Sequence, residues 1–112
     1  MTVTDAAWVR VGSLDELPPG EMTAIEVDER RIAVYRLDTG EVYATDDVCT
    51  HAMAFLSEGW LEGDEVECPL HGGRFNVRTG AGLCAPIDQD LRTYPVRIDG
   101  ADVLVDLSDR GS

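Results

Sequence analysis

Residues 49–51 read Cys49-Thr50-His51, and residues 68–71 read Cys68-Pro69-Leu70-His71, with sixteen residues between the two segments. The chain of 112 residues contains only two histidines and three cysteines. Both histidines and two of the cysteines fall in these segments, a clustering that scattered structural residues would not show. Each segment offers one thiolate and one imidazole, spaced so that a single tight loop can point both at a metal. The segments therefore predict a Cys₂His₂ metal site.

Such a set has two established uses. It can hold a structural zinc ion, or it can ligate a [2Fe–2S] cluster in which two histidines replace two cysteines on one iron. A zinc finger would carry its histidine pair on a helix, whereas here each segment mixes one cysteine with one histidine and no helix is evident. The pattern therefore favours a cluster over zinc. Its candidate ligands are Cys49, His51, Cys68 and His71.

The rest of the chain consists of short segments of strand propensity separated by turn residues. Pro18-Pro19-Gly20 ends any helix that begins at Ser13, and pairs such as Gly63-Asp64 and Asp99-Gly100 mark tight turns. The expected strands cover residues 8–11, 22–27, 32–37, 42–45, 66–67, 74–78, 92–98 and 103–107, with a loop at 83–90. We predict an all-β fold, a small antiparallel β sandwich or barrel. Residues 1–112 form one domain, and a subdomain of loops at about 46–86 carries the metal site.

Composition limits the possible partners. The formal net charge is −13, and all nine basic residues are arginine, which argues against binding to nucleic acid. No apolar run approaches the roughly 20 residues that span a bilayer, and the first residues do not resemble a secretory signal. Three cysteines, two of them in the metal segments, favour a reducing compartment. We therefore expect a cytoplasmic monomer with no membrane association.

An acidic run lies between the two metal segments. It comprises Glu58, Glu62, Asp64, Glu65 and Glu67, with no basic residue among them. The acidic surface as a whole could equally serve solubility alone, but this run would place negative charge near the metal site and therefore favours docking on basic partner surfaces. Cys84, the third cysteine, is expected to be a small apolar filler rather than a ligand.

The two metal segments resemble the Rieske signature, Cys-x-His followed by Cys-x₂-His. The likeness extends to Leu56-Ser57-Glu58-Gly59, to the segment 74–80 and to Tyr94-Pro95-Val96. The resemblance implies one Rieske-type [2Fe–2S] cluster, with Cys49 and Cys68 on the buried iron and His51 and His71 on the outer, reducible iron. It also implies that residues 80–86 form a proline-bearing loop that shields the cluster.

Departures from the motif indicate the subclass. High-potential Rieske proteins carry an additional cysteine in each loop and hydroxyl residues after the second segment, but the matching positions here are Ala54, Leu70, Gly73 and Phe75. Without a disulfide or hydroxyl donors to the cluster sulfur, the reduced state is less stabilised. We expect a ferredoxin with a midpoint potential on the order of −150 mV.

The resemblance implies an electron-transfer component rather than an enzyme. It would take electrons from a flavin-dependent NAD(P)H ferredoxin reductase and pass them to a terminal Rieske non-haem iron oxygenase that hydroxylates aromatic compounds. Both partners would dock transiently on the histidine-side surface. The alternative is the small subunit of an assimilatory nitrite reductase. An oxygenase in its own right would need two further histidines and a carboxylate for mononuclear iron, and the cluster uses every histidine in the chain.

Overall fold

The computed structural model describes residues 8–27, 29–49, 54–70, 72–83 and 90–107. These residues form ten strands and two 3₁₀ helices, and every strand pair is antiparallel. The elements are β1 (Trp8–Ser13), η1 (Leu14–Glu16), β2 (Glu21–Val27), β3 (Arg30–Arg36), β4 (Val42–Asp46), η2 (Leu56–Glu58), β5 (Trp60–Glu62), β6 (Glu65–Glu67), β7 (Arg74–Asn76), β8 (Thr93–Tyr94), β9 (Val96–Asp99) and β10 (Asp102–Asp106).

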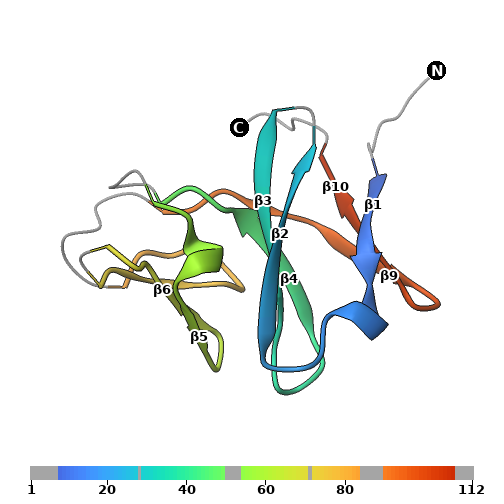
Figure 1. The fold of residues 1–112 in the computed structure, drawn as a ribbon, viewed down its shortest axis with the longest axis horizontal. Coiled ribbons are helices and arrows are strands. Elements are labelled where there is room, and N and C mark those ends of the chain that lie inside the picture. The colour runs from blue at the N-terminus through green and yellow to red at the C-terminus, as the bar shows by residue number, and fades with distance from the viewer. Residues whose placement is uncertain (1–7, 28, 50–53, 71, 84–89, 108–112) are drawn as a thin grey trace.

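The strands form three sheets arranged along the long axis of the molecule. The sheet β2-β3-β4-β8 lies in the middle, the sheet β1-β10-β9 at one end, and the sheet β5-β6-β7 at the other (Figure 1). We call the β5-β6-β7 sheet, with the described residues of the flanking segments 47–59 and 68–73, the loop lobe. The expected all-β antiparallel fold is confirmed, and the loop lobe contains a small sheet of its own.

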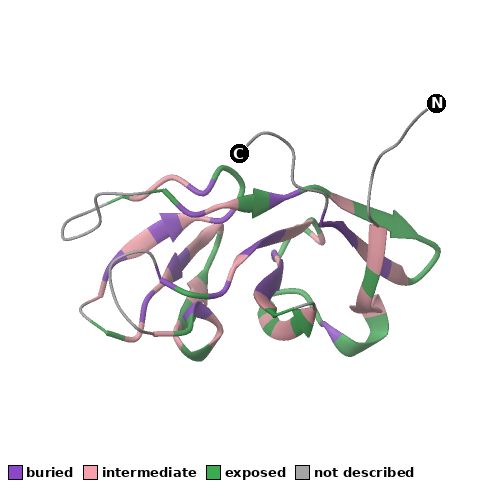
Figure 2. Ribbon diagram, turned by 90° about the horizontal axis from the view of Figure 1, so that it is seen from above, coloured by how far each residue is buried: buried purple, intermediate pink, exposed green. Residues whose placement is uncertain are grey.

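Strand β3 explains why the three sheets hold together. Its run Ile32-Ala33-Val34-Tyr35 is buried throughout, as a strand covered on both faces requires (Figure 2). Because side chains alternate along a strand, Ala33 and Tyr35 enter one hydrophobic core while Ile32 and Val34 enter another. The first core includes Cys49 and Cys68, and the second joins the middle sheet to the β1-β10-β9 sheet.

Proline divides a strand that the sequence predicted as continuous. The expected strand 92–98 is two strands in different sheets, with β8 paired to β4 and β9 paired to β10. Pro95 lies between them and has no backbone N–H to donate to a ladder. Its carbonyl accepts a hydrogen bond from Asp106 N at 3.0 Å, so the chain changes sheets at this residue.

Two further boundaries differ from expectation. The strand predicted over 74–78 ends at Asn76, because the side-chain oxygen of Asn76 accepts from the N–H groups of Arg78 and Thr79 and bends the chain into a turn. Strand β5, Trp60–Glu62, was not predicted at all. It pairs with β6 across the two-residue turn Gly63-Asp64. A two-residue turn of this kind joins a strand on each side. The Gly63-Asp64 pair was therefore the sequence signal from which β5 could have been predicted.

The helical elements are short. Ser13 caps η1 through a capping box with Glu16, and the helix ends before Pro18-Pro19-Gly20, as that segment predicts. Among the residues that the structure describes, no helix has the length and apolar character needed to cross a membrane.

Gly59 allows the two halves of the loop lobe to approach closely. A Cβ added at this residue would lie 1.9 Å from the carbonyl oxygen of Glu67 and 3.1 Å from Cδ of Pro69. Both neighbours belong to the chain that enters the second metal segment, so this glycine links the end of η2 to that segment.

We predict that Gly59→Ala lowers the free energy of unfolding by about 3 kcal/mol, because the backbone of Glu67 must move to admit the methyl group. The measurement is chemical denaturation followed by circular dichroism. Gly12→Ala is the matched control, since the nearest heavy atom to its added Cβ is 3.8 Å away. Equal stability of the two variants would contradict the close approach.

Candidate metal centre

The two metal segments form loops closed by equivalent hydrogen bonds. The N–H of Cys49 donates to the carbonyl of Ala54 at 2.9 Å, and the N–H of Cys68 donates to the carbonyl of Gly73 at 2.7 Å. In each loop the cysteine is the first residue and the hydrogen bond reaches five residues ahead. His51 and His71 lie within these loops in the sequence, but outside the described residues.

Paired strands hold the second loop, and an isolated antiparallel bridge holds the first. Residues 68–73 join β6 to β7, whose register pairs Glu67 with Arg74 directly before and after the loop. The first loop is flanked by an antiparallel bridge between Val48 and Phe55. Both loops therefore begin and end at fixed points.

The two thiols meet inside the protein. Cys49 and Cys68 are 3% and 1% exposed, and their side chains are within hydrogen-bonding reach of each other. Burial is the largest cause that raises the pKa of the Cys68 thiol to about 11; the neighbouring Cys49 acts in the same direction, and the Leu70 N–H, which donates to the sulfur, acts against it. The Cys68 thiol therefore stays neutral unless a nearby positive charge stabilises its thiolate.

This donor set fits an iron–sulfur cluster. Two adjacent buried sulfurs can bind one iron, which supplies the positive charge that their thiolate forms need. The N–H of Leu70 already donates to one sulfur, an arrangement that stabilises cluster thiolates. Gly72 adopts a φ of 69° at the turn of the second loop, a backbone conformation that L side chains rarely adopt.

The two positions that match the hydroxyl residues of high-potential Rieske proteins, Gly73 and Phe75, provide no side-chain donor. Gly73 has no side chain, and Phe75 is fully buried in the hydrophobic core that contains both cysteines. Phe75 therefore packs the core beneath the loops. This placement agrees with the expectation that hydroxyl donors are missing at these two positions.

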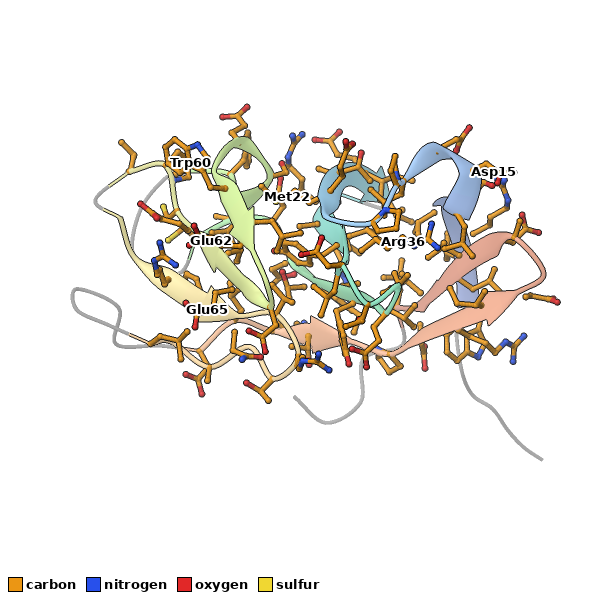
Figure 3. The ribbon with its side chains drawn as sticks, turned by 90° about the horizontal axis from the view of Figure 1, so that it is seen from below. Asp15, Met22, Arg36, Trp60, Glu62 and Glu65 are labelled. Carbon is orange, nitrogen blue, oxygen red and sulfur yellow. The ribbon has the colours of Figure 1, made fainter. Side chains whose placement is uncertain are left out.

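The acidic run near the loops is paired with arginine. Arg74 of β7 contacts Glu62 and Glu65 of the same sheet at 3.1 and 3.3 Å, two residues whose positions are labelled in Figure 3. It also contacts Glu67 at 2.9 Å. One arginine thus pairs with three acids of the run, and it offsets part of their negative charge within the loop lobe.

Arg78 pairs with a fourth acid of the run and joins the loop lobe to the middle sheet. Its guanidinium contacts Asp64 at 3.2 Å and Glu41 at 2.8 Å, and it donates to the hydroxyl of Tyr43. The hydrogen bond from Arg78 lowers the pKa of the Glu41 carboxyl. The acidic run therefore offers less unpaired negative charge for docking than the sequence predicted.

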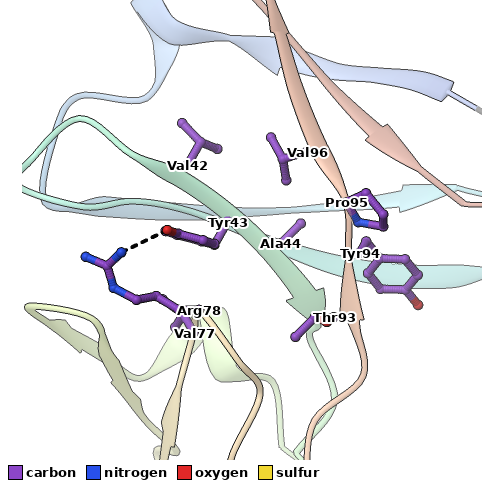
Figure 4. Close-up of a pocket in the computed structure, with 9 residues that line it drawn as sticks. All are labelled: Val42, Tyr43, Ala44, Val77, Arg78, Thr93, Tyr94, Pro95 and Val96. Carbon is purple, nitrogen blue, oxygen red and sulfur yellow. Dashed lines mark hydrogen bonds between the residues drawn. The ribbon is translucent and has the colours of Figure 1, made fainter.

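A cavity of about 440 Å³ lies beside this arginine, between the middle sheet and the end of β7 (Figure 4). Arg78 is the charged residue of its lining, and its guanidinium is already bound to Glu41, Asp64 and Tyr43. The expected metal ligands do not line it. The lining residues are Val42, Tyr43, Ala44, Val77, Arg78, Thr93, Tyr94, Pro95 and Val96.

Sequence reasoning missed a buried carboxylate next to the first loop. Asp47, two residues before Cys49, is fully buried and pairs with Arg31 of β3. An aspartate at a strand end usually indicates a turn, so the sequence offered no signal for this role. Cys84 lies outside the described residues, and its expected role as an apolar filler stays a prediction.

Comparison with known proteins identifies the family. The model of the Rieske [2Fe–2S] domain matches residues 7–95, and the chain therefore belongs to the Rieske [2Fe–2S] family. The ferredoxin component of a naphthalene 1,2-dioxygenase system from Pseudomonas aeruginosa is 50% identical over 101 residues, which cover 90% of this chain and 96% of that protein.

Solved structures give the same result. The ferredoxin of carbazole 1,9a-dioxygenase from Nocardioides aromaticivorans IC177 superposes with a TM-score of 0.82 at 45% identity, covering 88% of this chain and 95% of that one. A chain of the complex of reduced oxygenase and oxidized ferredoxin in carbazole 1,9a-dioxygenase superposes with a TM-score of 0.81 at 40% identity. The match covers 87% of this chain and 99% of that chain. A putative nitrite reductase small subunit from Mycobacterium tuberculosis has a TM-score of 0.84 at 24% identity, covering 96% and 100%, and shows the fold alone.

These matches confirm three expectations from the sequence: the Rieske family, the all-β fold and the Rieske-type [2Fe–2S] cofactor.

Proposed function

We propose that the chain is a one-electron carrier whose [2Fe–2S] cluster is held by Cys49, His51, Cys68 and His71. The observation that carries the proposal is the meeting of two buried thiols at the start of two equivalent loops, each of which contains one of the two histidines of the chain. Four ligands are what such a cluster needs, and the two loops contain this complete set.

The cluster, when bound, accepts and releases one electron. The chain keeps its two sulfur ligands dry, because both cysteines belong to the same core as Phe75 and Tyr35. The exclusion of water and the hydrogen bonds of the loops hold the ligands in one geometry. Little structural rearrangement is therefore needed when the cluster gains or loses an electron. The histidines supply ligands that carry no charge, which eases reduction compared with a four-thiolate cluster.

The partners we propose are a flavin-dependent NAD(P)H ferredoxin reductase and the terminal oxygenase of an aromatic-ring dioxygenase system. Relatives at 45–50% identity are named as ferredoxins of dioxygenases, and one structural relative is a ferredoxin in complex with an oxygenase. The nitrite reductase alternative has support from structural matches at only 24% and 25% identity. The ferredoxin role is therefore better supported.

Exposed apolar side chains indicate where these partners dock. Of the six large hydrophobic residues exposed among the described residues, four belong to the loop lobe and a fifth, Leu83, is hydrogen-bonded to β7. Leu70 lies between the two ligands of the second loop, Val48 and Phe55 bracket the first, and the N–H of Leu83 donates to the carbonyl of Arg74. We call this set the apolar rim: Val48, Phe55, Trp60, Leu70 and Leu83.

The rim suits brief redox encounters. Apolar contacts of small area bind without long residence, and four acids of the nearby run are paired with Arg74 or Arg78. The proposed docking surface is thus apolar at its centre and close to the histidine-bearing loops. The remaining net negative charge of the chain acts at longer range.

We predict that the purified chain supports product formation when it replaces the ferredoxin in a reconstituted naphthalene 1,2-dioxygenase system, the system of its 50% identical relative. His71→Ala should support none and should lack the Rieske-type EPR signal, while its circular dichroism spectrum stays that of a β protein. A Rieske-type signal in His71→Ala would contradict the ligand set. Product formation by the reconstituted system at the same rate with and without the wild-type chain would contradict the carrier role.

We predict a midpoint potential near the low end of the Rieske range, on the order of −150 mV, because Gly73 and Phe75 provide no hydroxyl to the cluster. The measurement is a redox titration followed by EPR. Gly73→Ser adds a hydroxyl at the position of a missing donor and should move the potential upward. A clearly positive midpoint in the wild-type chain would refute this assignment.

We predict that Leu83→Ser slows electron delivery to the oxygenase by roughly fivefold, which corresponds to about 1 kcal/mol of lost docking energy. The matched control is Ile98→Ser, since Leu83 and Ile98 are similarly exposed, at 45% and 42%, and Ile98 belongs to β9 in the sheet at the other end of the molecule. The measurement is stopped-flow oxidation of the reduced chain by oxygenase. Equal rates for the two variants, with equal potentials, would exclude the rim as the docking surface.

A further inference from the structure

Asp47 is a fully buried carboxylate that receives three hydrogen bonds. Nε of Arg31 donates to its Oδ2 at 2.6 Å, the Ser57 hydroxyl donates to the same oxygen at 2.9 Å, and the backbone N–H of Ser57 donates to Oδ1 at 2.7 Å. A buried charge is costly unless it is paired and hydrogen-bonded, and this one is both. None of these three hydrogen bonds is part of the backbone hydrogen bonding between strands.

These contacts surround the first loop. Asp47 precedes the loop and Ser57 follows it, and the N–H of Leu56 also donates to the Asp47 carbonyl at 2.7 Å. One aspartate therefore joins both ends of the segment that carries Cys49 and His51.

Arg31 connects this carboxylate to the central strand of the molecule. It belongs to β3, and its carbonyl accepts from the N–H of Asp47 at 2.9 Å. Its guanidinium lies 4.0 Å from the centre of the Phe55 ring, the residue that bridges Val48 across the loop. Arg31 thus contacts the loop on two sides, through a carboxylate before it and an aromatic ring at its end.

We propose that Arg31 and Asp47 are positioning residues for the cluster: they fix the first ligand loop on β3, and they balance each other's charge close to the cluster. The proposal rests on the ligand assignment above, in which Cys49 and His51 belong to this loop.

The charge balance follows from the position of the pair. Reduction adds one negative charge to the cluster, and a buried charge two residues from a ligand is poorly screened by solvent. The negative Asp47 and the positive Arg31 cancel at a distance of 2.6 Å. Among the described residues, removing the charge of Asp47 leaves Arg31 with only the exposed Glu26, 3.8 Å away, so the positive charge beside the first loop is less well balanced and the potential of the cluster must respond.

Two variants of the cluster-loaded protein test the proposal. Asp47→Asn keeps the size of the side chain and removes its charge, and Arg31→Lys keeps the charge and removes the guanidinium that spans Asp47 and Phe55. Both should release the cluster to a chelator about tenfold faster than wild type, the scale of effect seen when groups that support metal ligands are changed. Asp47→Asn should also shift the midpoint potential to more positive values, because the positive Arg31 then favours reduction. Arg31→Lys should leave the potential unchanged.

Asp102→Asn is the matched control, because Asp102 forms the same kind of pair with Nε of Arg10 at 2.8 Å on the exposed β1-β10 ladder. It should change neither cluster release nor potential. Release from Asp47→Asn and Arg31→Lys at the rate of Asp102→Asn would overturn the proposal, and so would an unchanged potential in Asp47→Asn. The EPR spectrum of His71→Ala decides the ligand assignment separately, so that the two claims fail independently.

Discussion

The alternation of side chains along β3 is the constraint on which the rest of the molecule depends. Because its two faces enter different cores, one strand joins the sheet β1-β10-β9 on one side to the loop lobe on the other. The core on the loop side contains Cys49 and Cys68, so the packing that stabilises the middle sheet also encloses the sulfur ligands. Arg31 of the same strand reaches the first loop through Asp47. The scaffold and the metal centre therefore share a single structural element.

The metal centre shows how a small β protein keeps thiolates out of water without a large pocket. Each cysteine begins a loop closed five residues later by its own N–H, and the two sulfurs meet between the loops. Burial raises the pKa of Cys68, so the thiolates are favoured when iron provides the compensating charge. Around the loops, arginines from β7 and its turn pair with the acids, and apolar side chains are exposed beside them.

The sequence was sufficient for the family and the cofactor because their signal is local. Cys-x-His and Cys-x₂-His each lie within four residues, and the turn pairs that delimit β6, β9 and β10 are equally local. What could not be predicted depends on contacts between distant segments. Asn76 is the exception, because it ends its strand through local hydrogen bonds from Arg78 and Thr79. Pro95 directs the chain from one sheet to another, and Asp47 becomes a buried anchor only because Arg31 lies beside it. The pairing of the acidic run with Arg74 belongs to the same group, since it depends on the register of β6 with β7.

The central claim is that one [2Fe–2S] cluster is bound by two cysteines and two histidines from these loops. Pulsed EPR of the reduced protein measures this directly, because nitrogen nuclei bound to iron couple strongly to the unpaired electron. We predict couplings from two imidazole nitrogens on one iron, lost when either His51 or His71 is replaced. A reduced cluster without nitrogen coupling, or a protein that binds zinc and shows no EPR signal on reduction, would contradict the account.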